Sequence, residues 1–475
     1  MFQTTEKHVD HQKLASLLCD RLIRVLRFPA ANVVNMTRDS CSTNGAAVRI
    51  MSVLPLMNSA DIMCFSHLLS GCGERVDLPV LTEFTTPWLG IVGGRQPNAA
   101  AKRMWLTMVA PQTVPGFSAV RWWAKAEIWF VMAENFNQIP ILIRRLLEHD
   151  IGEATTIKMS GILRDKKYQL ELELATILDA RRIVKTTYDL EGDRLEIMVV
   201  WDRIEELRAW GRALASNQEG VVPIVDSLLR RRAKLVPGLV ISKIFPGHGM
   251  CNAKIVSSET VDSSLYPGQE RMAYTVKYDT DGVEEDLEEE EIRPLIKVRE
   301  LGERKQATSR LSKAIEYLEE RLGSGVGEQI FDVSEAYELC RLVQVFDPEF
   351  AIANANPAWV DSMAAGIRPI AALADLDAMK TELPTYLAAA AGTTFDKTDI
   401  EAYTKDLLAW WRKHGKRIPA WANAARIAFA FSPNSASCER VFSLLENMFG
   451  ETQGKALSDY IEGALMLAYN NRVLG

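Results

Sequence analysis

The sequence predicts a mixed, mainly α-helical protein with an α/β unit near its N-terminus and a small β-rich module inside a long helical region. Three observations lead to this prediction. Apolar residues recur at three- and four-residue steps over most of the chain, as on amphipathic helices. Short apolar runs near residues 30–36 and 62–66 are typical of buried strands. The pattern changes abruptly at Lys234 to short β-rich runs divided by turns.

Bulk properties narrow the class of protein. The 475 residues exceed what one core usually holds, so several domains are expected. A hydrophobic content of 48% and a charged content of 25% fit a soluble globular protein, and no apolar run could span a bilayer. The net charge of -7 leaves DNA contact to local basic patches. The seven scattered cysteines, without CxxC spacing, indicate free thiols, a reducing compartment and no zinc finger. No signal peptide is visible, so an intracellular protein is expected.

The N-terminal unit follows from a helix–strand–turn–helix pattern. Residues 10–30 fit an amphipathic helix, 30–36 a buried strand and 46–54 a second helix. Asp39 lies in the turn after the strand, where a parallel strand delivers its side chain to a surface crevice. The alternative for Asp39 is a turn or helix N-cap residue. A second strand at 62–66 leads into another helix.

Helical patterns then dominate residues 121–232. The segment 168–174 alternates in polarity and leaves a strand open, although its flanks favour helix. Strands are expected at 239–245, 253–256 and 274–278, with turns at 246–249 and 281–282, which together predict an inserted small barrel. The acidic run 284–291 is expected to be a solvated edge or loop. Helices return after Leu301, and a final amphipathic helix is expected over 457–469.

The end of the chain carries a specific resemblance. The segment LLAWWRKHGKRIPAWANAARIAFAFSPNSASCERVFSLLENMF resembles the hAT transposase family pattern of a Trp-Trp pair, a proline, a hydrophobic strand and then Ser-Ala-Ser-x-Glu-Arg-x-Phe-Ser. LSDYIEGALMLAYNNR is similar to the family's closing dimerisation helix. Four further segments upstream resemble family motifs. RDSCSTN resembles the turn that carries the second catalytic aspartate, and CFSHLL resembles the CxxH segment that follows it. VRWW resembles the Arg-Trp motif, and VQVFDPEF is similar to the apolar-Asp-Pro segment late in the helical insertion.

The resemblance implies a ribonuclease H-like core interrupted by a helical insertion. Its parts would be a partial core at 1–118 that lacks the first strand, helical insertion at 119–233 and 299–405, an inserted barrel at 234–298, and a C-terminal dimerisation region at 406–475 that completes the core.

The resemblance also implies an Asp-Asp-Glu active site for DNA cleavage. Three carboxylates would hold two divalent metals, for which Mg²⁺ is the suitable hard cation. Asp39 matches the second aspartate and Glu439 the glutamate, so these two are the expected catalytic and metal-binding residues. The alternative for Glu439 is a solvated helix residue paired with Arg440. No residue before Asp39 follows an apolar strand, so only two carboxylates are identifiable and a crippled enzyme is expected.

Other motif residues have binding roles in the resemblance. Trp122 would stack on a base beside Arg121, with a core position as the alternative. Cys64 and His67 match the segment near the active site; two ligands are too few for a metal, and packing is the simpler interpretation. The DNA-binding candidates at the C-terminal end are Lys413, Lys416 and Arg417, for which a solvated helix face is an equal alternative.

The inserted barrel resembles Tudor-like modules, which bind methylated cations in aromatic cages. The candidate cage residues are Phe245, Tyr274 and Tyr278, with Asp279 or Asp281 as counter-charge. Met250 and Cys251 stand where such modules usually have an aromatic residue, and a structural barrel without a ligand is the alternative.

These inferences predict a nuclear, homodimerising, DNA-binding protein derived from a hAT transposase and catalytically crippled, without membrane association. One alternative is an active metal-dependent transposase. The other is a chromatin scaffold that binds histone tails through the barrel.

Overall fold

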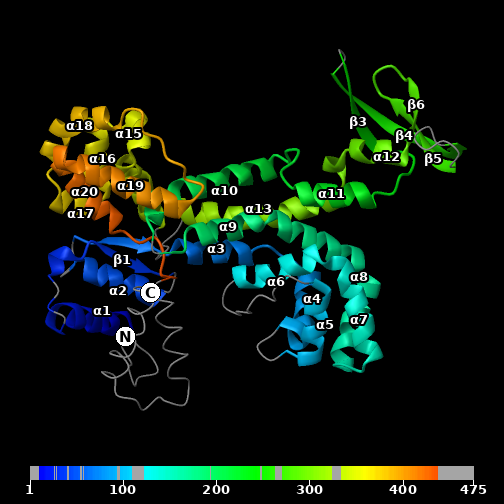
Figure 1. The fold of residues 1–475 in the computed structure, drawn as a ribbon, viewed down its shortest axis with the longest axis horizontal. Coiled ribbons are helices and arrows are strands. Elements are labelled where there is room, and N and C mark those ends of the chain that lie inside the picture. The colour runs from blue at the N-terminus through cyan, green and yellow to red at the C-terminus, as the bar shows by residue number, and fades with distance from the viewer. Residues whose placement is uncertain are drawn as a thin grey trace. The chain divides into compact units, whose positions relative to one another are not determined.

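A computed structural model shows the chain as a mainly helical protein with two small sheets (Figure 1). The mainly α prediction is therefore confirmed. The structure describes residues 10–25, 27, 29–39, 42–53, 56, 58–93, 97–109, 122–192, 194–246, 249–262, 270–323 and 333–436. It divides into two compact units. Unit 1 comprises residues 1–72, 183–208 and 317–475, and unit 2 comprises residues 73–182 and 209–316. No helix in the described part of the chain is long and apolar enough to cross a membrane.

Unit 1 begins with the predicted α/β unit. Its elements are α1 (His11–Cys19), a π-helical turn (Asp20–Val25), β1 (Asn35–Arg38), α2 (Ser42–Val53) and β2 (Ala60–Met63). Strands β1 and β2 pair in parallel with Asn35 opposite Ala60 and Arg38 opposite Met63. A small core of Ala15, Ala47 and Met51 joins α1 to α2. Figure 1 shows both helices beside β1. The predicted strand at 30–36 lies further along the chain, because residues 30–32 form a 3₁₀ turn.

The rest of unit 1 is a helical bundle near the C-terminus. Its helices begin at well-capped positions: Asp347, Asn356, Asp375 and Asp399 accept backbone N–H groups at the starts of four of them, which satisfies donors that a helix leaves unpaired. The helices are α14 (Val333–Val343), α15 (Pro348–Asn354), α16 (Pro357–Gly366), α17 (Arg368–Leu373), α18 (Leu376–Ala390), α19 (Ile400–His414) and α20 (Pro419–Phe429).

An aromatic core holds this bundle together. The Tyr386 and Trp421 rings lie 4.6 Å apart, and both side chains are fully buried. Buried indole and phenol groups usually need a hydrogen-bond partner. Trp411 Nε1 donates to the Phe346 carbonyl at 2.9 Å, and Trp421 Nε1 donates to the Met379 carbonyl at 2.8 Å. The Trp-Trp motif therefore contributes core side chains.

The apolar segment 425–431, expected as a hydrophobic strand, belongs largely to helix α20 and ends in a short turn. Its alanine-rich sequence favours helix, and Pro419 stands at the first helical position. The Glu382 carboxylate accepts the N–H groups of Ala420 and Trp421, which stabilises the helix start. Helix propensity and capping thus prevail over the strand pattern.

Unit 2 contains a helical part and the β-rich module. The 168–174 segment lies within the long helix α8, so helix rather than strand is correct there. Helices α3, α9, α10 and α13 contain the boundaries between the units. The elements are α3 (Phe65–Glu74), α4 (Pro79–Trp88), α5 (Ala99–Val109), α6 (Trp122–Glu134), α7 (Ile139–Glu148), α8 (Glu153–Asp179), α9 (Arg181–Asp189), α10 (Val200–Ala215), α11 (Pro223–Arg232), α12 (Glu289–Ile292) and α13 (Gly302–Leu322).

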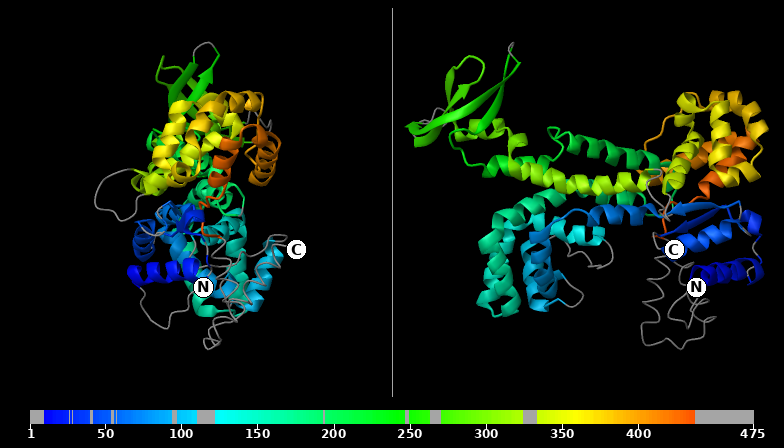
Figure 2. Two further views of the ribbon diagram at one scale, coloured as in Figure 1. Left: turned by 90° about the vertical axis from the view of Figure 1, so that its left-hand side faces the viewer. Right: turned by 180° about the vertical axis from the view of Figure 1, so that it is seen from behind.

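The β-rich module is an antiparallel sheet in the order β3-β4-β5-β6, drawn in green in Figure 2. Its strands are β3 (Val240–Phe245), β4 (Gly249–Asp262), β5 (Glu270–Tyr278) and β6 (Glu284–Glu288). A single bridge between Ile241 and Ile296 is the only pairing beyond these strands, so the described residues form an open sheet and not the expected barrel. The acidic run 284–291 forms the edge strand β6 and the short helix α12. Glu288 and Glu291 form a capping box at the start of α12.

Candidate functional site at the strand ends and in the C-terminal region

Asp39 lies directly after β1, at the carboxyl end of the parallel strand pair. Asn44 Nδ2 donates to Asp39 Oδ1 at 2.8 Å, which orients the carboxylate. The preceding Arg38 is buried and binds Asp61 with two hydrogen bonds of 2.8 and 3.0 Å. This planar pair ties β1 to β2 across the sheet. The predicted position of Asp39 at the end of a parallel strand is therefore what the structure shows.

The segment from Ser432 to Ser435 is fixed to the same strand ends. Thr37 Oγ1 donates to the Ser432 carbonyl at 2.6 Å. The backbone N–H of Phe65 donates to the Pro433 carbonyl at 2.9 Å. These bonds join residues that lie 395 and 368 positions apart in sequence. Ser435 precedes Glu439 by four residues, so the segment that leads to Glu439 starts beside the turn that carries Asp39. Glu439 itself lies outside the described residues.

Cys64 and His67 support this junction. The Cys64 thiol is fully buried, and its sulfur accepts hydrogen bonds from the Ser435 backbone and hydroxyl, both at 3.3 Å. Burial raises the pKa of the thiol, but His67 and Ser435 more than offset that effect, so the pKa lies below its ordinary value. The CxxH segment thus holds the Ser435 segment in place. This geometry favours its packing role.

A magnesium site cannot be assembled from the described residues. No three His, Cys, Asp or Glu side chains among them group closely enough to hold a metal ion. Asp39 is the one member of the expected carboxylate pair that is described, and one carboxylate with an amide neighbour does not suffice for two hard cations. The Asp39–Glu439 metal site therefore stays a prediction.

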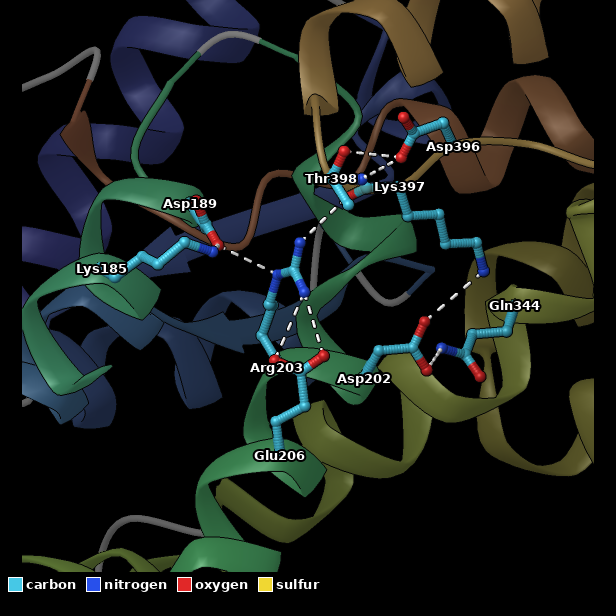
Figure 3. Close-up of polar contacts among 9 residues, drawn as sticks. All are labelled: Lys185, Asp189, Asp202, Arg203, Glu206, Gln344, Asp396, Lys397 and Thr398. Carbon is cyan, nitrogen blue, oxygen red and sulfur yellow. Dashed lines mark hydrogen bonds and ion pairs between the residues drawn. The ribbon is translucent and has the colours of Figure 1, made fainter. Parts of the chain in front are cut away.

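A polar cluster that sequence reasoning missed fixes the segment before α19, and Figure 3 draws its contact between Lys397 and Asp202. The Lys397 ammonium lies 2.9 Å from Asp347 Oδ2 and 3.5 Å from Asp202 Oδ2. Tyr403 Oη also donates to Asp347 Oδ2, at 2.9 Å. Burial lowers the pKa of Lys397, but the two carboxylates more than offset this and raise it, so the lysine stays charged. We call Asp202, Asp347, Lys397 and Tyr403 the Lys397 cluster.

Neighbouring contacts extend the Lys397 cluster along α9 and α10. Arg203 Nη2 donates to the Lys397 carbonyl at 2.9 Å, and Arg203 Nε pairs with Asp189 at 3.0 Å (Figure 3). Asp347 also caps α15 by accepting the Glu349 N–H at 2.9 Å. The apolar-Asp-Pro motif therefore has a physical role, since its aspartate serves as cap, ion-pair partner and hydrogen-bond acceptor. That motif is the one sequence signal that pointed to the cluster.

A comparison with known protein families finds a match in this part of the chain. Residues 392–470 match the family model described as the hAT family C-terminal dimerisation region. Residues 392–470 are therefore similar to that dimerisation region, and we call them the hAT region. The match begins just after α18, and the Lys397 cluster lies at its N-terminal end. No curated protein matches the chain.

The hAT region carries the predicted basic surface. Lys413, Lys416 and Arg417 are exposed at the end of α19, and none has a partner among the described residues. From residue 407 to residue 438 the chain has five Lys or Arg residues and no Asp or Glu. Trp410 stacks on His414 at 4.6 Å beneath this surface. Burial and the charges of Lys413 and Arg417 lower the pKa of His414, so its ring is neutral at pH 7.

Trp122 lies in the core of unit 2. Its side chain is 3% exposed, and a Cβ added to Gly73 would lie 2.0 Å from its ring, so the ring packs directly on that glycine. This burial favours packing over the base-stacking role, which needs an open ring face. Arg121 lies outside the described residues.

The proposed cage residues do not form an open cage. Tyr274 and Tyr278 are 8% and 5% exposed. Phe245 meets Tyr278 edge-on at 5.2 Å, while the Lys243 ammonium lies 5.3 Å from the Phe245 ring centre. Tyr278 donates to Glu285 at 2.5 Å, and Lys243 pairs with the same carboxylate. The Asp281 carboxylate accepts a hydrogen bond from the Val283 N–H in the same loop at 3.0 Å. The chain's own lysine therefore covers the Phe245 face.

Proposed function

We propose that this chain is a hAT transposase-derived nuclear protein that self-associates through residues 392–470 and binds DNA through the basic surface at the end of α19. The hAT dimerisation match carries the proposal. The dimerisation region supplies the self-association, and the basic surface within it supplies the cations that duplex phosphates attract. With a net charge of -7, a local surface of this kind is what DNA contact requires.

The structural order of the region supports the proposal. The Lys397 cluster fixes its start, the aromatic core fixes α19 and α20, and the strand ends hold residues 432–435. The basic residues therefore project from a rigid framework, which reduces the entropy lost on binding.

A DNA titration tests the binding part. The triple variant Lys413→Ala, Lys416→Ala, Arg417→Ala removes three exposed charges. A matched control, Arg144→Ala, Lys158→Ala, Lys167→Ala, removes three exposed charges from unit 2. Each lost phosphate contact should lower the slope of log affinity against log salt by about 0.9. The test triple should therefore bind duplex DNA more weakly with a shallower slope, and the control should match wild type. Equal behaviour of the two triples would refute this binding surface.

DNA cleavage is the second candidate function, favoured by one observation. Residues 432–435, which lead toward Glu439, are hydrogen-bonded to the strand ends next to Asp39, and this supports an approach of the two carboxylates. A magnesium-dependent cleavage assay on hairpin DNA, comparing wild type with Asp39→Asn and Glu439→Gln, decides between the candidates. Loss of activity in both variants would establish the enzyme. No cleavage by wild type, or equal cleavage by all three proteins, would exclude an Asp39–Glu439 active site.

A histone-tail reader would need the Phe245 ring face for a methylated cation. Lys243 covers that face and pairs with Glu285. The observations therefore support the DNA-binding proposal over the reader.

A further inference from the structure

A cavity of about 370 Å³ lies in unit 1, and the Arg38–Asp61 pair forms part of its lining. Ligand pockets in proteins typically have volumes of about 300–1,000 Å³, so a ligand of mononucleotide size fits. Its lining comes from α2, β1, β2, α14, α16 and α17, all within the same compact unit. Ala60 and Leu339 provide apolar wall, and the remaining lining is rich in arginine.

Three arginines line this cavity, and two of them lack a partner. Arg38 is neutralised by its two bonds to Asp61. Arg49 on α2 and Arg368 on α17 are exposed, and neither has a hydrogen-bond or ion-pair partner within the described ranges. Glu335 is the second carboxylate of the lining, so three cations face two anions. Two unpaired guanidinium groups at one cavity leave their donors open for an external anion.

The geometry points to a phosphate-binding site in this cavity, formed by Arg49 and Arg368 and backed by the Arg38–Asp61 pair. A guanidinium group presents its donors in a planar fork that matches phosphate oxygens. Residues from two separate helices contribute, so the fold brings together charges that lie more than 300 positions apart in sequence. The apolar wall beside them suits the sugar or base of a nucleotide, whether free or within a nucleic acid strand.

The site differs from the basic surface on α19, since no residue of that surface lines the cavity. It therefore goes beyond the proposed function. Glu335 sets its affinity, because a carboxylate in the lining repels a phosphate. Replacing Glu335 with glutamine should strengthen phosphate binding, whereas removing either guanidinium should weaken it.

Calorimetric titration of the full chain with inorganic phosphate and with adenosine monophosphate tests the site. The double variant Arg49→Gln, Arg368→Gln should bind both probes at least about tenfold more weakly than wild type, because two charge-assisted contacts are lost. Glu335→Gln should bind them more tightly. Both arginines are exposed, and an unchanged circular dichroism spectrum confirms folding of the variants.

A single-stranded oligonucleotide distinguishes the source of the phosphate. If the double variant loses affinity for phosphate and adenosine monophosphate but not for the oligonucleotide, the site takes a free nucleotide; if it loses affinity for the oligonucleotide as well, the site also takes a nucleic acid backbone. Either result supports the site. Unchanged affinity of the double variant for all three probes, or no binding of any probe to wild type, would overturn it. The α19 triple variant should bind inorganic phosphate as wild type does, so failure of the cavity site and failure of the proposed function give different results.

Discussion

Replacing Lys397 with methionine should destabilise unit 1 and loosen the start of the hAT region. The substitution keeps the aliphatic length but removes the ammonium that lies 2.9 Å from Asp347. The Asp347 carboxylate is 1% exposed, so it would be left buried without its counter-ion. Breaking a buried ion pair by removing one partner costs about 3–5 kcal/mol. The lower end applies here, about 3 kcal/mol, because Lys397 is 27% exposed and Asp347 keeps its bonds from Tyr403 and Glu349.

Urea unfolding followed by tryptophan fluorescence measures this change, because four tryptophans lie in the same helical bundle. A loss of about 3 kcal/mol should lower the transition midpoint by roughly 1 M urea. Hydrogen exchange over residues 391–403 should also accelerate. Lys405→Met is the matched control: its ion pair with Glu401 on α19 is exposed at both ends and should contribute little. Equal midpoints for the two variants would refute the role given to the Lys397 cluster.

Three further changes test other parts of the structure. Arg304→Met removes the partner of Asp226, both side chains being almost fully buried, and should cost unit 2 about 3–5 kcal/mol in urea unfolding; a loss below about 1 kcal/mol would contradict the pairing. Gly73→Ala places a methyl group where the Trp122 ring lies and should lower the free energy of unfolding by about 1–3 kcal/mol; an unchanged free energy would contradict this packing. Burial raises the pKa of Asp179 from 3.8 to about 6, so the contribution of this group to stability is greatest at low pH and should fall by about 2 kcal/mol as pH rises from 4 to 6. Asp179→Asn should abolish that component of the pH dependence, and an unchanged pH profile would contradict it.

The local pattern of the sequence was enough to place the N-terminal strands and Asp39. Period and turn chemistry are local properties, and they predicted these elements with displaced bounds: β1 spans 35–38 where 30–36 was expected, and β2 spans 60–63 where 62–66 was expected. The helix at 168–174 followed from its flanks. The segment 425–431 was misjudged, because the apolar run alone did not reveal the cap that Glu382 supplies from another helix.

Tertiary contacts account for what the sequence could not show. Sheet closure depends on long-range pairing, and among the described residues only Ile241 and Ile296 provide it beyond the four strands. Core tryptophans and surface tryptophans look alike in sequence, so the burial of Trp122 against Gly73 needed the structure. Ion pairs between distant segments, such as Lys397 with Asp347 and Asp202, leave no periodic signal. The Asp-Pro motif marked one partner only.

Self-association through the hAT region underlies the proposed function, and it can be measured as the molar mass of the full chain in solution. Light scattering over a concentration series from about 1 to 50 µM should give at least twice the 53.1 kDa of one chain at the upper end. A constant mass of one chain across the whole series would contradict the account.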